Sequence, residues 1–279
     1  MNRAGRTGGA GRGAGAGSDV VGPGSSDPGR LVLAVVLLAL LVVRPLAAQD
    51  ARQIVDEAQK RQRSASERYE GQLRVVDAKG RTFDKSWAFT RLGSHGNSKS
   101  ILRFTGPADV KGVALLVVNH PDRASDQWMW TPSIARDRRI APQSRSQRFF
   151  NTDFSFEDLE ERDVSQYDYR LLGDDTLDGV VCWKIEARSK EAKSSQYTLS
   201  RVWIRKDTYA FAQIENEIKG QLARRLKYLD LKNVQGIWTA LRIEMHDLRR
   251  NSRTTLRLEK LEYNVPSKDE DFTLQALRR

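Results

Sequence analysis

The sequence predicts an α+β protein in which one large antiparallel sheet carries a short helix. Three observations support this class. A helical pattern of apolar residues follows residue 50, the apolar period changes to two from Tyr69 onwards, and turn motifs recur between the alternating segments. Because strand follows strand without helices in between, an antiparallel meander is favoured over a parallel sheet.

The helix is predicted in the segment DARQIVDEAQKRQRSASERY. Ala51, Ile54, Val55 and Ala58 recur in it at helical spacing. Asp50 precedes them as an N-cap, because its carboxylate can accept a hydrogen bond from a free N–H group of the first turn. The apolar stripe is narrow, so we expect a helix that lies on the sheet.

Five strand segments, TFDKSWAF, ILRF, QWMW, VVCWKIEA and ALRIEMH, place large apolar side chains on one side of each strand. The turn motifs DAKG, LGSHGN, GDDTLDG, RKDTY and NVQG lie between strands. In TTLRLEKLEYNV the apolar set moves from Leu256 and Leu258 to Leu261 and Tyr263, a one-residue slip that predicts a β-bulge.

The first 48 residues differ from the rest. A Gly/Ala/Ser-rich segment reaches Arg30 and predicts disorder, and thirteen apolar residues, 31–43, then run between Arg30 and Arg44. This run is short for a membrane span, and with the small residues of PLAAQD after it, it predicts a signal peptide cleaved near Ala48. An uncleaved anchor is the alternative. We expect residues 1–48 to be a disordered n-region plus signal peptide, residues 49–279 to be a single domain, and the mature protein to be exported.

The net charge of +11 raises the question of nucleic-acid binding. The basic residues are interleaved with acidic ones, as in RRLKYLDLK, whereas a nucleic-acid groove usually shows a denser basic stripe. We therefore expect no nucleic acid, and a transient contact of the basic surface with anionic lipid headgroups. Cys182 is the only cysteine, so no intramolecular disulfide can form.

Acidic and aromatic residues are concentrated between Ser146 and Ser189. Within this stretch, Ser155 and Asp158 have the spacing of a capping box, and Phe154 and Leu159 stand at the positions of a hydrophobic staple. The pattern predicts a short helix that begins at Ser155, with its acids near the N-terminal end or on the solvent side. We interpret these carboxylates as structural rather than catalytic.

No catalytic or metal-binding motif is found. His95, His120 and His246 lack metal-ligand spacing, and the chain has neither a glycine-rich phosphate loop nor a nucleophile elbow. We therefore expect no metal, no cofactor and no catalytic residues. A Ser-His-Asp triad needs no local signature, so an envelope hydrolase stays open as a less favoured alternative.

Several motifs together resemble one known family. They are the run from WMWTPSIARDRRI through NTDFSFEDL, then RVWIRKDTYAFAQIE, GIWTALRIEMHD and the closing DEDFTLQAL. In these the chain, from about Ala51 to Leu277, resembles the outer-membrane lipoprotein-sorting, LolA-like periplasmic proteins. The resemblance implies a half-open, strongly curved antiparallel β-barrel wrapped over a few short helices, with an apolar cavity that holds acyl chains. It also implies that the mature protein is periplasmic.

The hypothesis from the sequence is a non-enzymatic carrier or binding protein for a lipid or a lipidated protein. Possible partners are an inner-membrane transporter and an outer-membrane acceptor. An envelope sensor or regulatory domain on the same fold is the main alternative. The candidate lining residues are the one-sided apolar residues of the strands: Trp87, Phe89, Leu102, Phe104, Trp128, Trp130, Trp183, Ile185, Leu241 and Ile243.

Overall fold

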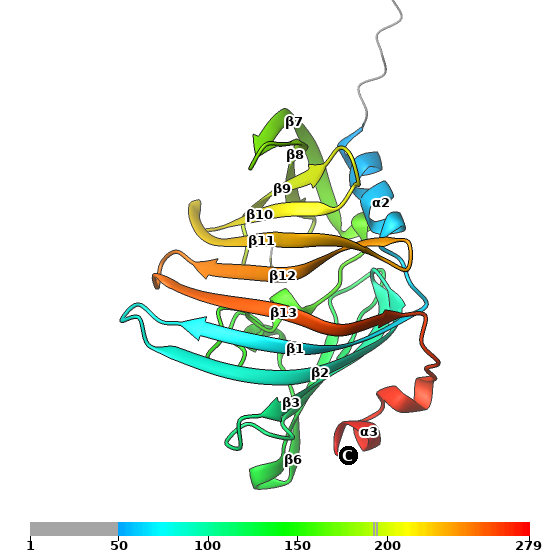
Figure 1. Cartoon of the computed structure of the whole chain (residues 1–279), viewed down its shortest axis with the longest axis vertical. Coiled ribbons are helices and arrows are strands. Elements are labelled where there is room, and N and C mark those ends of the chain that lie inside the picture. Colours follow the sequence, from blue (N-terminus) through cyan, green and yellow to red (C-terminus); the bar gives the residue numbers. More distant parts are fainter. Residues whose placement is uncertain (1–49, 192, 194) are drawn as a thin grey trace, which may run out of the picture. The chain divides into compact units, whose positions relative to one another are not determined.

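Thirteen strands form one antiparallel sheet in residues 50–191, 193 and 195–279, the part of the chain that the computed structural model describes. Their spatial order is β6-β5-β4-β3-β2-β1-β13-β12-β11-β10-β9-β8-β7 (Figure 1). The strands are β1 (Ser66–Val76), β2 (Thr82–Ser94), β3 (Asn97–Gly106), β4 (Ala114–Val118), β5 (Asp126–Thr131), β6 (Arg136–Arg139), β7 (Tyr167–Leu177), β8 (Val180–Ser189), β9 (Leu199–Arg205), β10 (Phe211–Ile218), β11 (Gln221–Val234), β12 (Ile237–Asp247) and β13 (Ser252–Tyr263). The predicted signal peptide lies outside the described residues.

The sheet is curved but not closed. Strands β6 and β7 are its two edges, and the pairing of β1 with β13 joins the first and last strands of the meander. Two α-helices are present in the described residues, α2 (Ala51–Arg61) and α3 (Leu274–Leu277). The predicted α+β class with a half-open, strongly curved antiparallel sheet is confirmed.

Strand β13 carries the predicted bulge. Its pairing with β1 shifts by one residue between Glu259 and Glu262, which face Glu70 and Arg68. Lys260, inside this shift, has a positive φ of 49°. The extra residue explains why the apolar side chains change from Leu258 to Leu261, and it increases the local twist of the strand.

Helix α2 begins where the sequence predicts. The side chain of Asp50 accepts a hydrogen bond from the backbone N–H of Arg52 at 3.1 Å. Ile54 and Ala58 are fully buried, and they pack with Ile185 of β8 and with two apolar residues of β9. The helix therefore covers the inner face of the sheet beside β7 (Figure 1).

The segment between β6 and β7, residues 140–166, lies against the inner face of the sheet. It contains three 3-10 turns, η2 (Pro142–Ser144), η3 (Glu157–Leu159) and η4 (Val164–Gln166). Phe149, Phe154 and Phe156 are buried in it, and they belong to one core cluster with Trp87 of β2 and Phe104 of β3. Because β6 and β7 are opposite edges, this connecting segment runs through the interior from one edge to the other.

The predicted helix start at Ser155 is wrong. The structure has a single 3-10 turn that begins at Glu157, and its N-cap position is Phe156. The carboxylate of Asp158 accepts the backbone N–H of Ser155 at 2.7 Å, as in a capping box, but the Ser155 hydroxyl donates to this carboxylate instead of capping the turn. The acids were also predicted near a helix end or in solvent, whereas the side chains of Glu157 and Glu160 are buried in ion pairs.

A separate apolar cluster lies on the outer face of the sheet. Ile101 and Leu116 pack there against Phe272 and against Leu277 of α3. None of the helices in the described part of the chain has the length and apolar character of a membrane span.

Candidate functional site

Three adjoining cavities line the inner face of the sheet. We name them cavity A, about 240 Å3, cavity B, about 250 Å3, and cavity C, about 160 Å3. Tyr228 of β11 lines all three, Asp158 and Leu226 line both A and C, and Tyr69 and Ile243 line both B and C. Because they share these lining residues, the three cavities adjoin one another, and we refer to them together as the hollow interior.

Cavity C is the most apolar of the three. Four of the candidate lining residues meet in it, namely Trp87, Phe89, Leu102 and Ile243. Trp87, Phe89 and Leu102 share one face of β2 and β3, because the strand register places Trp87 opposite Phe104 and Phe89 opposite Leu102. Ile243 comes from β12. Phe89 also stacks on Tyr69 of β1, with their ring centroids 4.7 Å apart.

A glycine makes room for the largest ring of cavity C. Gly71 of β1 pairs with Trp87 of β2. A Cβ atom at position 71 would lie 2.0 Å from Nε1 of Trp87. The buried Nε1 atom has no hydrogen-bond partner in the described residues. Trp87 therefore lies flat over the backbone of β1, and only glycine leaves the space for it.

Three other candidate residues lie on the inner side but outside cavity C. Phe104 stacks on Phe149 of the connecting segment, with ring centroids 5.4 Å apart, and it forms solid core. Trp183 and Ile185 belong to the cluster under α2.

The remaining three candidates are not brought to this site. Trp128 and Trp130 belong to the outer cluster with α3, because the register between β4 and β5 pairs Leu115 with Met129 on the inner face. Leu241 is half-buried in β12 and lines none of the three cavities. Alternation places Trp128 and Trp130 on one side of β5, and the structure shows that this side is the outer face of the sheet.

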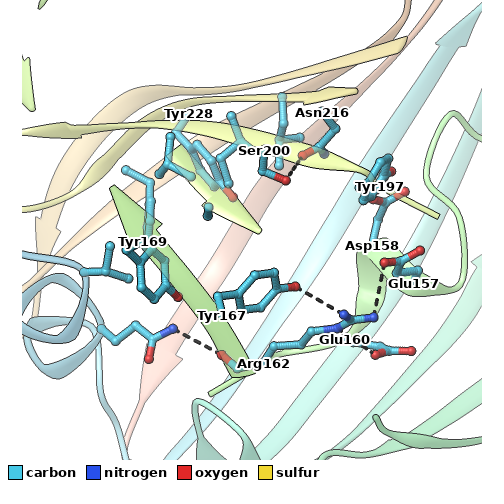
Figure 2. Close-up of a pocket in the computed structure, with 17 residues that line it drawn as sticks. Glu157, Asp158, Glu160, Arg162, Tyr167, Tyr169, Tyr197, Ser200, Asn216 and Tyr228 are labelled. Carbon is cyan, nitrogen blue, oxygen red and sulfur yellow. Dashed lines mark hydrogen bonds and ion pairs between the residues drawn. The ribbon is translucent and has the colours of Figure 1, made fainter. Parts of the chain in front are cut away.

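Cavity A has a polar wall that comes from the connecting segment (Figure 2). Arg162 donates to Glu157 and to Glu160, at 3.2 Å in each case, and to the hydroxyl of Tyr167 at 3.2 Å. Glu160 also lies 3.5 Å from Arg145. Burial raises the pKa of Glu160 above its usual value, although both arginines oppose that shift.

A second buried ion pair completes this wall. Arg224 of β11 donates to Asp158 at 2.6 Å and to the hydroxyl of Tyr197 at 3.0 Å. Tyr197 in turn donates to the other oxygen of Asp158 at 2.6 Å. The side chains of Asp158 and Arg224 are 7% and 2% exposed. These bonds fix the connecting segment to β11 on the inner face of the sheet.

Cavity B is lined by a third ionic group. Arg91 of β2 pairs with Glu67 of β1 at 2.5 Å and with Glu161 of the connecting segment at 3.4 Å. Burial raises the pKa of Glu67, while Arg91 opposes the shift. Burial lowers the pKa of His95, which also lines this cavity. The wall around Ile237, Ala240 and Leu258 is apolar.

The described residues contain no cluster of three His, Cys, Asp or Glu side chains that could hold a metal ion. Among them, His120 contacts Asp126 and Arg123, and His246 contacts Glu244. No histidine ring in the described part of the chain is bonded to a serine or cysteine side chain. The three cavities are lined by apolar side chains, hydrogen-bonding groups and paired ionic side chains.

The polar wall was not found from the sequence. Gln59, Arg162, Tyr169, Tyr197 and Tyr228 all line cavity A or bond to its wall, and none was a candidate. The only signal in the sequence was the concentration of acids and aromatic residues between Ser146 and Ser189. Arg162 lies in the same stretch, whereas Arg224 comes from β11, and no local pattern indicates that it pairs with Asp158.

Comparison with solved structures identifies the fold. A domain provisionally named as an outer membrane lipoprotein-sorting protein domain, from Vibrio parahaemolyticus, has a TM-score of 0.78 at 24% identity and covers 82% of this chain and 98% of its own. A DUF1329 family protein from Desulfovibrio piger ATCC 29098 has a TM-score of 0.77 at 27% identity, and the match covers 81% of this chain and 97% of that protein. A LolA superfamily protein from Nitrosomonas europaea has a TM-score of 0.65 at 21% identity, and the match covers 81% of this chain and 98% of that protein.

The chain thus has the LolA-like fold that the sequence motifs suggested. Residues 96–279, more than half of the chain, match the model of a protein family whose description reads "Uncharacterized protein". The chain belongs to this family. No curated protein sequence matches the chain.

Proposed function

We propose that this protein is a periplasmic carrier or binding protein that shelters the acyl chains of a lipid or a lipidated protein. The observation that carries the proposal is the hollow interior, in which the apolar cavity C adjoins cavities A and B through shared residues such as Tyr228. The names of the similar structures, one from lipoprotein sorting and one from the LolA superfamily, support the same class of ligand.

The size of the interior supports an acyl ligand. Each cavity alone is smaller than an ordinary small-molecule site of about 300–1,000 Å3, whereas the three together fall within that range. Each methylene group that leaves water contributes about 0.8 kcal/mol. A long acyl chain therefore gains useful affinity from apolar walls alone, and the binding needs no catalytic residue.

A carrier of lipids has to meet a membrane surface, and the β5–β6 hairpin offers suitable chemistry. Ile134 at its turn is 66% exposed. Arg136 and Arg138 follow on β6, and both are exposed without an ion pair in the described residues. An apolar tip beside cationic side chains suits an anionic lipid surface. We include this contact in the proposal.

The proposal also includes export by the predicted signal peptide, a single mature domain from residue 49, and transfer between an inner-membrane transporter and an outer-membrane acceptor. Sequencing of the N-terminus of protein isolated from the periplasm tests the first two parts. Mass spectrometry of lipids that copurify with the protein identifies the cargo.

Binding itself is tested with purified, delipidated protein and an uncharged fluorescent acyl ester. We expect about one probe per chain, and displacement by long acyl compounds. Shortening a competitor by four carbons should weaken it by about two orders of magnitude or somewhat less, because each buried methylene contributes about 0.8 kcal/mol. A folded, delipidated protein that binds no acyl compound of any length would overturn the proposal.

A further inference from the structure

Cavity A differs from cavity C in having unused hydrogen-bonding groups. The side chain of Gln59 on α2 is only 9% exposed and lines cavity A. Its Nε2 donates to the backbone carbonyl of Arg162 at 3.1 Å. This bond fixes the orientation of the amide, and Oε1 is left buried without a partner in the described residues. A buried acceptor without a hydrogen-bond partner costs free energy. A ligand that donates a hydrogen bond to this oxygen would remove that cost.

Two tyrosine hydroxyls face the same cavity. Tyr169 of β7 and Tyr228 of β11 line cavity A, and neither hydroxyl makes a hydrogen bond to another described residue. Burial raises the pKa of both tyrosines, so both hydroxyls keep their protons and can donate. Figure 2 shows Tyr169 and Tyr228 on the side of the cavity away from Glu157 and Glu160.

The charges around cavity A are already matched. Glu157, Asp158 and Glu160 line it, and Arg162 is the only cationic residue among the described lining residues. Arg162 is bonded to two of the carboxylates, and Arg224 and Arg145 lie against Asp158 and Glu160. A charged headgroup would therefore lose its hydration without gaining an ion pair, because the charged side chains around cavity A are already paired with one another.

We propose that cavity A is a headgroup subsite for an uncharged acyl lipid that carries an O–H or N–H donor and an acceptor oxygen. The donor group binds Oε1 of Gln59, and Tyr169 and Tyr228 donate to the acceptor oxygen. The acyl chain leaves this subsite along the wall that Leu226 and Tyr228 share with cavity C. This inference rests on the proposed function, because it assigns the orientation and class of the acyl ligand.

The test compares four competitors with the same lauroyl or dodecyl chain, measured by displacement of the uncharged fluorescent acyl ester at neutral pH. Monolauroylglycerol has donors and acceptors, methyl laurate has acceptors only, laurate is anionic and dodecylamine is cationic. We expect monolauroylglycerol to bind about tenfold more tightly than each of the others, the effect of one or two buried hydrogen bonds.

Variants assign the preference to named atoms. Gln59→Leu removes the acceptor and should reduce the preference for monolauroylglycerol over methyl laurate to about twofold or less. Gln53→Leu, on the exposed side of the same helix, is the matched control and should retain the full preference. Tyr169→Phe, which keeps the ring, should weaken monolauroylglycerol and methyl laurate alike. Circular dichroism checks that each variant is folded.

The outcomes separate the two proposals. If no lauroyl compound displaces the probe, the acyl-binding function fails. If all four displace it equally, or if laurate or dodecylamine is the strongest, acyl binding holds and the neutral subsite is wrong. If the preference exists but survives Gln59→Leu, the subsite lies elsewhere in the interior, and the assignment to cavity A is wrong.

Discussion

Oδ2 of Asp158 lies 2.6 Å from a guanidinium nitrogen of Arg224, and 66 residues separate the two in the chain. Asp158 belongs to the η3 turn of the connecting segment, and Arg224 is a buried residue of β11. The bond therefore fixes the segment that crosses the interior to β11 of the sheet. Since Asp158 also lines cavities A and C, the same contact shapes the proposed binding site.

Replacement of Asp158 by asparagine should destabilise the fold. The variant leaves the buried guanidinium of Arg224 without its closest carboxylate, and removal of one partner of a buried pair typically costs about 3–5 kcal/mol. Urea unfolding measures the change. Asp84→Asn, which breaks the exposed pair with Arg74, is the control and should have a much smaller effect. Equal effects of the two variants would contradict the structural role of Asp158.

Phe89 and Trp130 allow a test of which face of the sheet binds the ligand. Both are half-buried aromatic residues, but Phe89 lines cavity C and Trp130 packs in the outer cluster. Phe89→Ala should weaken binding of the fluorescent acyl ester by about tenfold or more, since it removes apolar contact area. Trp130→Ala should leave the affinity unchanged in protein that remains folded. The reverse result would place the ligand on the outer face.

The stability of the protein should depend on pH through Asp126. Arg123, with Arg139 and His120, holds the pKa of the Asp126 carboxyl well below its usual value of 3.8. The folded state therefore binds fewer protons than the unfolded state, and the stabilisation is fully present above pH 3.8 and is lost as the pH falls towards the depressed pKa.

Asp126→Asn removes this dependence. In urea unfolding, the difference in free energy between wild type and Asp126→Asn should be largest near neutral pH and should shrink below about pH 4. A difference that stays constant down to about pH 3 would show that the ion pairs of Asp126 add nothing to stability.

The β5–β6 hairpin should bind anionic membranes. Arg136→Glu with Arg138→Glu reverses two exposed charges beside Ile134 and should abolish most of the cosedimentation with phosphatidylglycerol vesicles, because each basic residue near the surface contributes about 1 kcal/mol. Lys219→Glu with Lys232→Glu makes the same charge change at exposed positions elsewhere and should retain binding. Equal losses in the two double variants would indicate a net-charge effect instead of a docking site.

The sequence alone determined the features that depend on neighbours along the chain. The spacing of Ile54 and Ala58 after Asp50 predicted α2, since helix periodicity and capping are local. Alternation predicted the strands that contain Trp87 and Phe89, and the slip between Leu258 and Leu261 predicted the bulge. The family motifs added the half-open curvature of the sheet.

The tertiary structure decided which faces and which charges meet. Alternation puts Trp128 and Trp130 on one side of their own strand, but only the register with β4 decides that this is the outer side of the sheet. The pattern of acids after Ser155 predicted a helix end or a solvent side, yet Glu157 and Asp158 are buried. Arg162 of the same segment pairs with Glu157, and Arg224 of the distant strand β11 pairs with Asp158. Pairings of this kind join residues that lie far apart in the chain, and a one-dimensional pattern does not say which of these residues the folded sheet brings together.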